Sequence, residues 1–167
     1  MGIFIIKTGV FIRARLRKLF YKLVYGKQIS FGKSFSFRRN FILYIEKGGS
    51  VEIGEDSFFN NNVSINCLEK IKIGKRCLFG EGVKLYDHNH RFRDLTKSIP
   101  EQGFTTKPIT IGDDCWICSN VTILQGVTIG NHSVIGANCL VYKDVPPHTI
   151  VKSGAGMTMV PIEPKGE

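Results

Sequence analysis

The stretch that decides the fold is residues 111–141, which read IGDDCWICSNVTILQGVTIGNHSVIGANCLV. An aliphatic residue recurs there at every sixth position: Ile111, Ile117, Ile123, Ile129, Ile135 and Val141. The position four residues later is small or β-branched each time: Cys115, Val121, Val127, Ser133, Cys139 and Val145. A six-residue period fits neither an amphipathic helix nor a two-faced strand. It predicts a short strand and a turn, repeated, with one apolar side chain pointing inward per strand.

The same period runs upstream of this stretch, interrupted once by a step of two residues. Its inward positions there are Ile53, Phe59, Ile65, Ile71, Ile73, Phe79 and Leu85, with a fainter set at Phe31, Phe37 and Leu43. Three units form one triangular coil of about 18 residues, and stacked coils bury a continuous apolar column. A β-sandwich is disfavoured because its strands recur about every 8–12 residues. Glycine often follows the inward residue, as at Gly112, Gly130 and Gly136, and we expect it to supply turns with positive φ.

The charge of the chain is concentrated in its N-terminal quarter. The 167 residues carry a formal net charge of +9, but residues 1–40 hold ten of the 23 Lys and Arg residues and no Asp or Glu. The remainder is therefore close to neutral, and because no nucleic-acid-binding module is recognised we expect no nucleic acid partner. The length suits a single domain.

Residues 10–27 have the pattern of an amphipathic helix, within a basic N-terminal arm at residues 1–28. Its apolar side chains recur at helical spacing between cations: Phe11, Ile12, Leu16, Leu19, Phe20, Leu23 and Val24. Such a helix caps the open end of a solenoid or lies on an anionic membrane as a peripheral anchor, and the two roles are compatible. No apolar run reaches the length of about 18 residues that a spanning helix needs.

The cysteines predict a reducing environment. Their number is odd and their spacing is not that of a zinc finger: Cys67, Cys77, Cys115, Cys118 and Cys139. No cleavable signal peptide is evident. We therefore expect free thiols, packed mainly in the core of a cytoplasmic protein.

With its repeat at residues 50–150, the chain resembles the hexapeptide-repeat acyltransferases, and within them the sugar O-acetyltransferases that include galactoside, maltose and surface-polysaccharide enzymes. The resemblance implies an all-β fold, a left-handed parallel β-helix, although general sterics favour right-handed crossovers. It implies a β-helix over residues 29–150 with a protruding loop at 87–108 and a C-terminal tail at 151–167. It also implies acetyl-CoA as donor, a sugar hydroxyl as acceptor, no metal, and a homotrimer with sites between subunits. We expect the protein in the cytoplasm, at the inner face of the membrane.

The segment that interrupts the repeat contains the candidate catalytic residues. The period stops after Leu85 and resumes near Ile109, and a long non-repeat loop in a regular solenoid is usually functional. Acyl transfer to a hydroxyl needs a general base, and imidazole is suited to that role near neutral pH. The resemblance places the catalytic histidine at His90, with His88 as the alternative. Asp87, Asp94 or a backbone carbonyl is expected to orient the ring.

Other positions acquire roles from the same resemblance. Asn60 matches an Asn that holds the acceptor hydroxyl, Asp87 is a second candidate for substrate contact, and Asn62 is expected to be a turn residue. Trp116 is expected to point outward beside the acyl donor, and Ser119 to contact the thioester carbonyl. Cys118, where glycine is common, is not expected to be a nucleophile, because the family reacts by direct attack in a ternary complex.

The predicted coenzyme A contacts continue towards the C-terminus. Ala137 leaves room for the pantetheine arm, and Lys143 can meet a phosphate. Pro146 and Pro147 are expected to end the periodic structure. The tail lacks arginine, so its contact with the nucleotide end of the donor is left open.

Three alternatives remain at this stage. One is N-acetylation of a nucleotide-linked amino sugar on the same scaffold. The second is a zinc hydratase built on this β-helix, which needs three imidazoles around one metal, although the four histidines do not have its spacing. The third is a non-catalytic scaffold.

Overall fold

The computed structural model describes the backbone of residues 2–154 and 158–161, and the side chains of residues 12–154, 159 and 161. It begins with α1 (Gly2–Tyr25) and a short 3-10 turn, η1 (Gly26–Gln28). All later regular structure is β, apart from a second 3-10 turn, η2 (Pro100–Gln102), so the predicted fold class is confirmed. Most of the tail predicted at 151–167, including Lys165, lies outside the described residues.

Three parallel sheets form the sides of the solenoid, and we name them sheets A, B and C. Sheet A contains β1 (Ile29–Phe31), β4 (Ser50–Ile53), β7 (Lys70–Ile73), β12 (Ile109–Ile111) and β15 (Thr128–Ile129). Sheet B contains β2 (Ser36–Phe37), β5 (Phe58–Phe59), β8 (Leu78–Phe79), β13 (Trp116–Ile117), β16 (Val134–Ile135) and β18 (Thr149–Lys152), with β19 (Thr158–Pro161) antiparallel at its edge. Sheet C contains β3 (Ile42–Ile45), β6 (Ser64–Cys67), β9 (Lys84–Tyr86), β14 (Thr122–Ile123) and β17 (Leu140–Val141).

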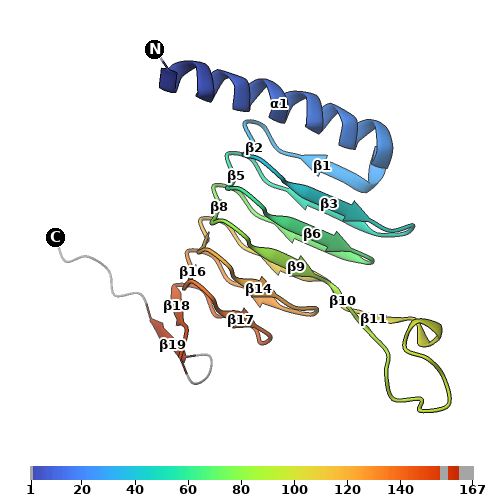
Figure 1. Ribbon diagram of the computed structural model, residues 1–167. Coiled ribbons are helices and arrows are strands. Elements are labelled where there is room, and N and C mark those ends of the chain that lie inside the picture. The colour runs from blue at the N-terminus through green and yellow to red at the C-terminus, as the bar shows by residue number, and fades with distance from the viewer. Residues whose placement is uncertain (1, 155–157, 162–167) are drawn as a thin grey trace.

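The chain visits sheets A, B and C in turn, and each circuit is one coil of a left-handed parallel β-helix (Figure 1). Equivalent inward residues stack in register, as Val51 pairs with Ile71 and Ile71 with Ile109. Every apolar residue of the periodic set at 111–141 is at most 1% exposed. The six-residue period is therefore confirmed as the inward position of each short strand.

Glycine is required in the repeat for close packing between coils and not, as the sequence suggests, for a positive φ. Gly54, Gly74 and Gly112 do not have positive φ. Instead, a Cβ at each would run into the next coil: on Gly54 it would lie 2.7 Å from the Lys75 nitrogen and closer still to the Gly74 carbonyl. The positive-φ turn positions are mostly taken by non-glycine residues, among them Asn62 (φ 61°) and Asn120 (φ 59°). Asn tolerates this conformation, so Asn62 is a turn residue as predicted.

Two predicted boundaries need correction. The periodic structure does not end at Pro146 and Pro147, because β18 follows them and pairs in parallel with β16, Ile150 opposite Val134. The two prolines lie in the turn before this strand, where Pro147 packs against Gly130 of the preceding coil. The N-terminal helix begins at Gly2 rather than near residue 10, and it ends at Tyr25.

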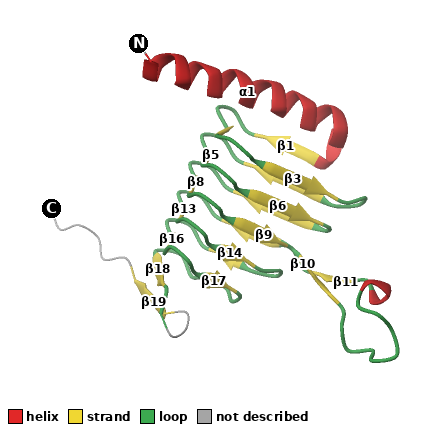
Figure 2. Ribbon diagram, in the orientation of Figure 1, coloured by secondary structure: helices red, strands yellow, loops and turns green. Residues whose placement is uncertain are grey.

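The helix α1 lies across the N-terminal end of the solenoid (Figures 1 and 2). The Tyr21 hydroxyl donates to the Phe41 carbonyl at 2.8 Å, and the Tyr25 hydroxyl to the Leu43 carbonyl at 3.1 Å. The Lys18 ammonium donates to the Phe35 carbonyl at 2.7 Å. These side chains satisfy carbonyls of the first coil that have no preceding coil to pair with. The helix therefore caps the open end.

We expect Gly54→Ala to lower the free energy of unfolding by about 1–3 kcal/mol, because the added methyl group must displace backbone of the next coil. Thermal or urea unfolding measures the loss. Gly26→Asn is the matched control, since Gly26 has φ 54° and no atom near its would-be Cβ. Equal stability of the two variants would contradict the steric explanation.

Candidate functional site

The predicted loop at 87–108 leaves the solenoid as a hairpin that sequence reasoning did not resolve. Strands β10 (His88–His90) and β11 (Phe104–Thr106) pair antiparallel, with His90 opposite Phe104. The base of the hairpin is closed by the Lys107 amide, which donates to the Asp87 carbonyl at 2.9 Å. Since β9 belongs to sheet C and β12 to sheet A, the hairpin projects from the edge between these sheets, which we name the C–A corner.

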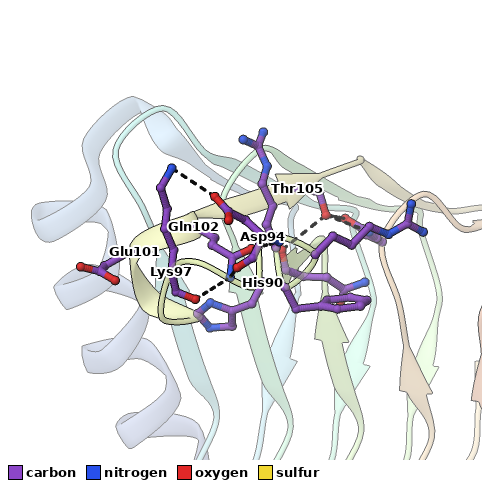
Figure 3. A pocket seen from close by; sticks show the side chains of 11 residues that line it. His90, Asp94, Lys97, Glu101, Gln102 and Thr105 are labelled. Atoms are coloured by element: carbon purple, nitrogen blue, oxygen red, sulfur yellow. Dashed lines mark hydrogen bonds and ion pairs between the residues drawn. The ribbon is translucent and has the colours of Figure 1, made fainter.

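His90 lies on the exposed side of this hairpin and lines a cavity of about 660 Å³ (Figure 3). Its ring packs against Phe104, with ring centroids 4.4 Å apart. The remaining lining comes from the loop itself and from Gln125 of the next coil, which lies 3.3 Å from the Thr105 hydroxyl. Within residues 12–154 no hydrogen bond holds the His90 imidazole, so both ring nitrogens are free to meet a substrate.

His88 has the opposite environment. Its side chain is largely buried, and its Nδ1 lies 3.2 Å from Oδ1 of Asp87. The Asp87 carboxylate is itself fully buried and accepts the Leu68 and Glu69 amides of the preceding coil, each at 2.8 Å. Asp87 thus ties the base of the hairpin to the solenoid. Its carboxylate presents no surface to an acceptor, which corrects the expectation of a direct substrate contact.

Neither carboxylate proposed as a partner of His90 reaches it. Asp94 accepts the Thr96 hydroxyl at 2.6 Å and lies 3.3 Å from the Lys97 ammonium. The Thr96 hydroxyl and amide, followed by Lys97, hold the pKa of Asp94 below its ordinary value. Asp94 therefore stabilises the fold of the loop, and Asp87 orients His88 rather than His90.

A second group of predicted residues gathers at the edge between sheets B and C, which we name the B–C corner. The turns that contain Asn60, Ser119 and Ala137 each connect a strand of sheet B to one of sheet C. Asn60 is half-buried, and its Oδ1 accepts from Arg38 at 3.2 Å and from the Asn61 amide at 2.9 Å.

Three features of this corner suit an acyl donor. Within the described residues the Ser119 amide donates no hydrogen bond, so it remains available to an oxygen atom. Ala137 is exposed and carries no large side chain. Trp116 is 53% exposed and points outward from β13, as predicted.

Lys143 does not join that group. It follows β17 at the C–A corner, the same corner as the histidines, and its ammonium lies 5.6 Å from the Tyr142 ring centroid. The structure thus places His90 and Lys143 at one end of the sheet C strands and Asn60, Ser119 and Ala137 at the other end. One chain alone does not bring His90 and Asn60 together.

The other candidate groups are structural. The five cysteines are free, and burial raises the pKa of the Cys118 thiol, which disfavours the thiolate a nucleophile needs. His132 and His148 stack at a different corner, with ring centroids 5.3 Å apart. Among the residues that the structure describes, no three His, Cys, Asp or Glu side chains gather in a way that would hold a metal.

Sequence reasoning missed Phe104 and Gln125. Phe104 contacts both histidine rings, at 5.4 Å from His88 and 4.4 Å from His90. Because it lies far along the chain from the histidines, only a predicted hairpin register would have paired them. Gln125 follows the inward residue Ile123 at an ordinary turn position, and nothing in the sequence distinguishes it.

Comparison with known proteins places this geometry in a family. The family model for the bacterial transferase hexapeptide (six repeats) matches residues 108–143. The putative lipopolysaccharide biosynthesis O-acetyl transferase WbbJ of Escherichia coli K12 is 31% identical over 140 residues, covering 66% of this chain and 71% of that protein. The chain belongs to the hexapeptide-repeat acetyltransferase family.

Other members of the hexapeptide-repeat acetyltransferase family are also similar to this chain in sequence and in structure. The galactoside O-acetyltransferase of E. coli K12 is 38% identical over 109 residues, 65% of this chain and 52% of that protein. A hexapeptide-repeat acetyltransferase of Vibrio cholerae, solved with acetyl coenzyme A, superposes with a TM-score of 0.69 at 34% identity, covering 80% of this chain and 71% of that one. The chain spans about half the length of the curated relatives it matches, from 34% upward.

We expect Asp87→Asn to lower the free energy of unfolding by about 1–3 kcal/mol, because the new amide NH₂ group would face one of the two backbone N–H donors. Thermal unfolding tests this. Asp94→Asn is the matched control, since the Asp94 carboxylate is partly exposed and bonds only within the loop. A loss of stability in the control equal to that in Asp87→Asn would contradict the anchoring role.

Proposed function

We propose that the protein is an acetyl-CoA-dependent O-acetyltransferase that transfers acetyl to a sugar hydroxyl in surface polysaccharide or its precursor. The observation that carries the proposal is the histidine-bearing hairpin inserted between coils of an acetyltransferase solenoid. Two similar proteins are a galactoside O-acetyltransferase and a putative lipopolysaccharide biosynthesis O-acetyl transferase, and a similar structure was solved with acetyl coenzyme A.

In this mechanism His90 is the general base. Its imidazole takes the proton of the acceptor hydroxyl while the hydroxyl oxygen attacks the thioester carbonyl carbon of acetyl-CoA. The carbonyl oxygen becomes an oxyanion, which the free amide of Ser119 stabilises. When the carbon–sulfur bond breaks, the proton held by His90 passes to the departing coenzyme A sulfur. The products are the O-acetyl sugar and coenzyme A.

The remaining predicted residues bind the two substrates. Asn60 holds the acceptor hydroxyl, Trp116 and Ala137 contact the acyl and pantetheine part of the donor, and Lys143 meets a donor phosphate. His88, tied to Asp87, supports the hairpin on which His90 is presented. It is the second candidate for the base should His90 prove dispensable.

The site requires a second protomer, because His90 and Asn60 lie at different corners of one chain. We assign the protein as a homotrimer in which the hairpin of one protomer reaches the B–C corner of the next. The outward side chains of sheet B support this assembly, since an apolar ladder runs along it from coil to coil: Phe58, Leu78, Trp116, Val134 and Ile150. Leu78 and Trp116 are about half exposed in the single chain. A threefold ring buries such a flank.

The basic arm at residues 1–28 is proposed to bring the enzyme to the inner face of a membrane. No helix in the described part of the chain is both long enough and apolar enough to cross a bilayer.

We expect His90→Ala to lower the rate of acetyl transfer by about 10²–10⁴-fold, with stability little changed because the ring is exposed. Release of free thiol from acetyl-CoA, measured across a panel of sugars, amino sugars and nucleotide sugars, checks this. His132→Ala is the control and should keep full activity. Full turnover by His90→Ala would overturn the mechanism. If amino sugars alone stimulated thiol release, the reaction would be N-acetylation and the proposed O-acetylation would be wrong.

We also expect two inactive variants to restore activity when they share a trimer. Subunits carrying His90→Ala and Asn60→Ala, co-expressed in equal amounts, should regain about one quarter of the wild-type rate, because random assembly leaves that share of intersubunit sites intact. Each variant expressed alone provides the baseline. Absence of recovery in a verified mixed trimer would place both residues in the same protomer's site.

A further inference from the structure

From residue 12 onward the outer side of α1 is apolar, and no segment that the structure describes covers it. From residue 12 onward, one side of the helix packs on the solenoid through Ala14 and Tyr21, which are buried. Leu23 lies nine residues after Ala14, and at about 100° per residue it therefore faces directly away from the solenoid. Six apolar side chains form this outer stripe, and all are more than half exposed, with Leu23 at 77%: Ile12, Leu16, Leu19, Phe20, Leu23 and Val24.

Cationic side chains lie on both sides of this stripe. The same helical spacing puts Arg15 and Lys22 along one flank, and Arg13 and Arg17 along the other. No Asp or Glu occurs in residues 1–40, and none of these four cations makes an ion pair within the described part of the chain. Burial, and then the charges of Arg15 and Lys22, lower the pKa of Lys18 beside them. Within the residues that the structure describes, no carboxylate compensates the positive charge of these four side chains.

Basic cavities continue the flanks onto the solenoid. One, of about 420 Å³, lies between α1 and the first B–C turn and is lined by Arg13, Arg17, Arg38 and Arg39 among others. A second, of about 730 Å³, is lined on the other flank by Arg15, Lys18 and Lys33 among others. Guanidinium groups bind phosphate oxygens in a forked geometry, so four arginines around one cavity form a phosphate-binding arrangement.

We propose that this end of the protein docks on an anionic phospholipid bilayer, with α1 parallel to the membrane plane and the solenoid standing on end. The apolar stripe enters the boundary between headgroups and acyl chains, and the flanking cavities receive lipid phosphates. This commits the stripe to a lipid surface rather than to a second protein copy, because two copies meeting through α1 would bring eight uncompensated flanking cations together. The inference rests on the membrane contact proposed above for the basic arm and specifies its surface and its lipid class; it does not depend on the acetyl-transfer chemistry, so either can fail without the other.

Flotation of the full-length protein with vesicles tests the proposal. We expect binding to phosphatidylcholine vesicles containing about 30% phosphatidylglycerol, weaker binding to pure phosphatidylcholine, and loss of binding in about 0.5 M NaCl. Leu19→Gln/Leu23→Gln should weaken binding about tenfold or more, since two exposed leucines no longer enter the bilayer. Leu95→Gln/Ile99→Gln removes two exposed apolar side chains elsewhere and should leave binding intact.

A charge-matched pair tests the cavities. Arg38→Gln/Arg39→Gln should weaken binding about tenfold, whereas Lys72→Gln/Lys84→Gln removes the same charge from exposed sites in the third coil and should change it little. Thermal unfolding verifies that each variant is folded. Equal binding to neutral and anionic vesicles, or unchanged binding after Leu19→Gln/Leu23→Gln, would overturn the proposal. Binding of free inorganic phosphate by a protein that does not bind vesicles would also overturn it, because the cavities would then take a soluble anion. A smaller oligomer in Leu19→Gln/Leu23→Gln would likewise overturn it, because the stripe would then mediate protein association.

Discussion

The close approach of one coil to the next governs the rest of this structure. Parallel strands in successive coils lie about 4.8 Å apart, which is the spacing that backbone hydrogen bonds require. At that spacing the turn after the inward residue of sheet A comes so near its neighbour that no Cβ fits, as at Gly54 and Gly74. The interior is equally restrictive, because each strand sends one or two large side chains inward, as β5 does with Phe59 and β7 with Ile71 and Ile73. A segment that does not obey these limits must leave the stack, as residues 87–108 do.

The sequence was sufficient to predict the repeating part of the fold because these limits act at every coil. The inward positions and the small residues four places later are almost all buried. Glu69 stands four places after the inward residue Ile65, where the pattern has a small or β-branched residue, and it is exposed. The reason for the glycines could not be predicted, since it depends on contact with residues about one coil away. Likewise the strand after Pro147 was missed because a proline turn looks the same in sequence whether or not a further strand follows.

The candidate site was predictable in its residue types and less so in its geometry. His90 was distinguished by the interruption of the repeat and by resemblance, and the structure places it on the exposed side of a hairpin. The pairing of Asp87 with His88 could not be foreseen, because the Asp87 carboxylate is held by amides of the preceding coil. The separation of His90 from Asn60 follows from topology alone: one lies after a sheet C strand and the other before one. Because one chain does not bring the C–A and B–C corners together, a second protomer is the natural source of the missing side of the site.

The two proposed assemblies constrain each other through symmetry. In a cyclic trimer every protomer has the same orientation along the threefold axis, so with the solenoids parallel to that axis all three copies of α1 lie at one end of the ring. Three apolar stripes in one plane can meet a bilayer together, which raises overall affinity without any new contact. The hairpin leaves the third coil from α1. At about 4.8 Å per coil, with the helix resting about 10 Å above the first coil, the base of the hairpin lies on the order of 20 Å from α1, measured along the solenoid axis. A membrane-bound trimer would therefore hold its acetyl-transfer sites within reach of saccharides attached to lipid, and the helix that closes the solenoid would also set the distance of those sites from the membrane.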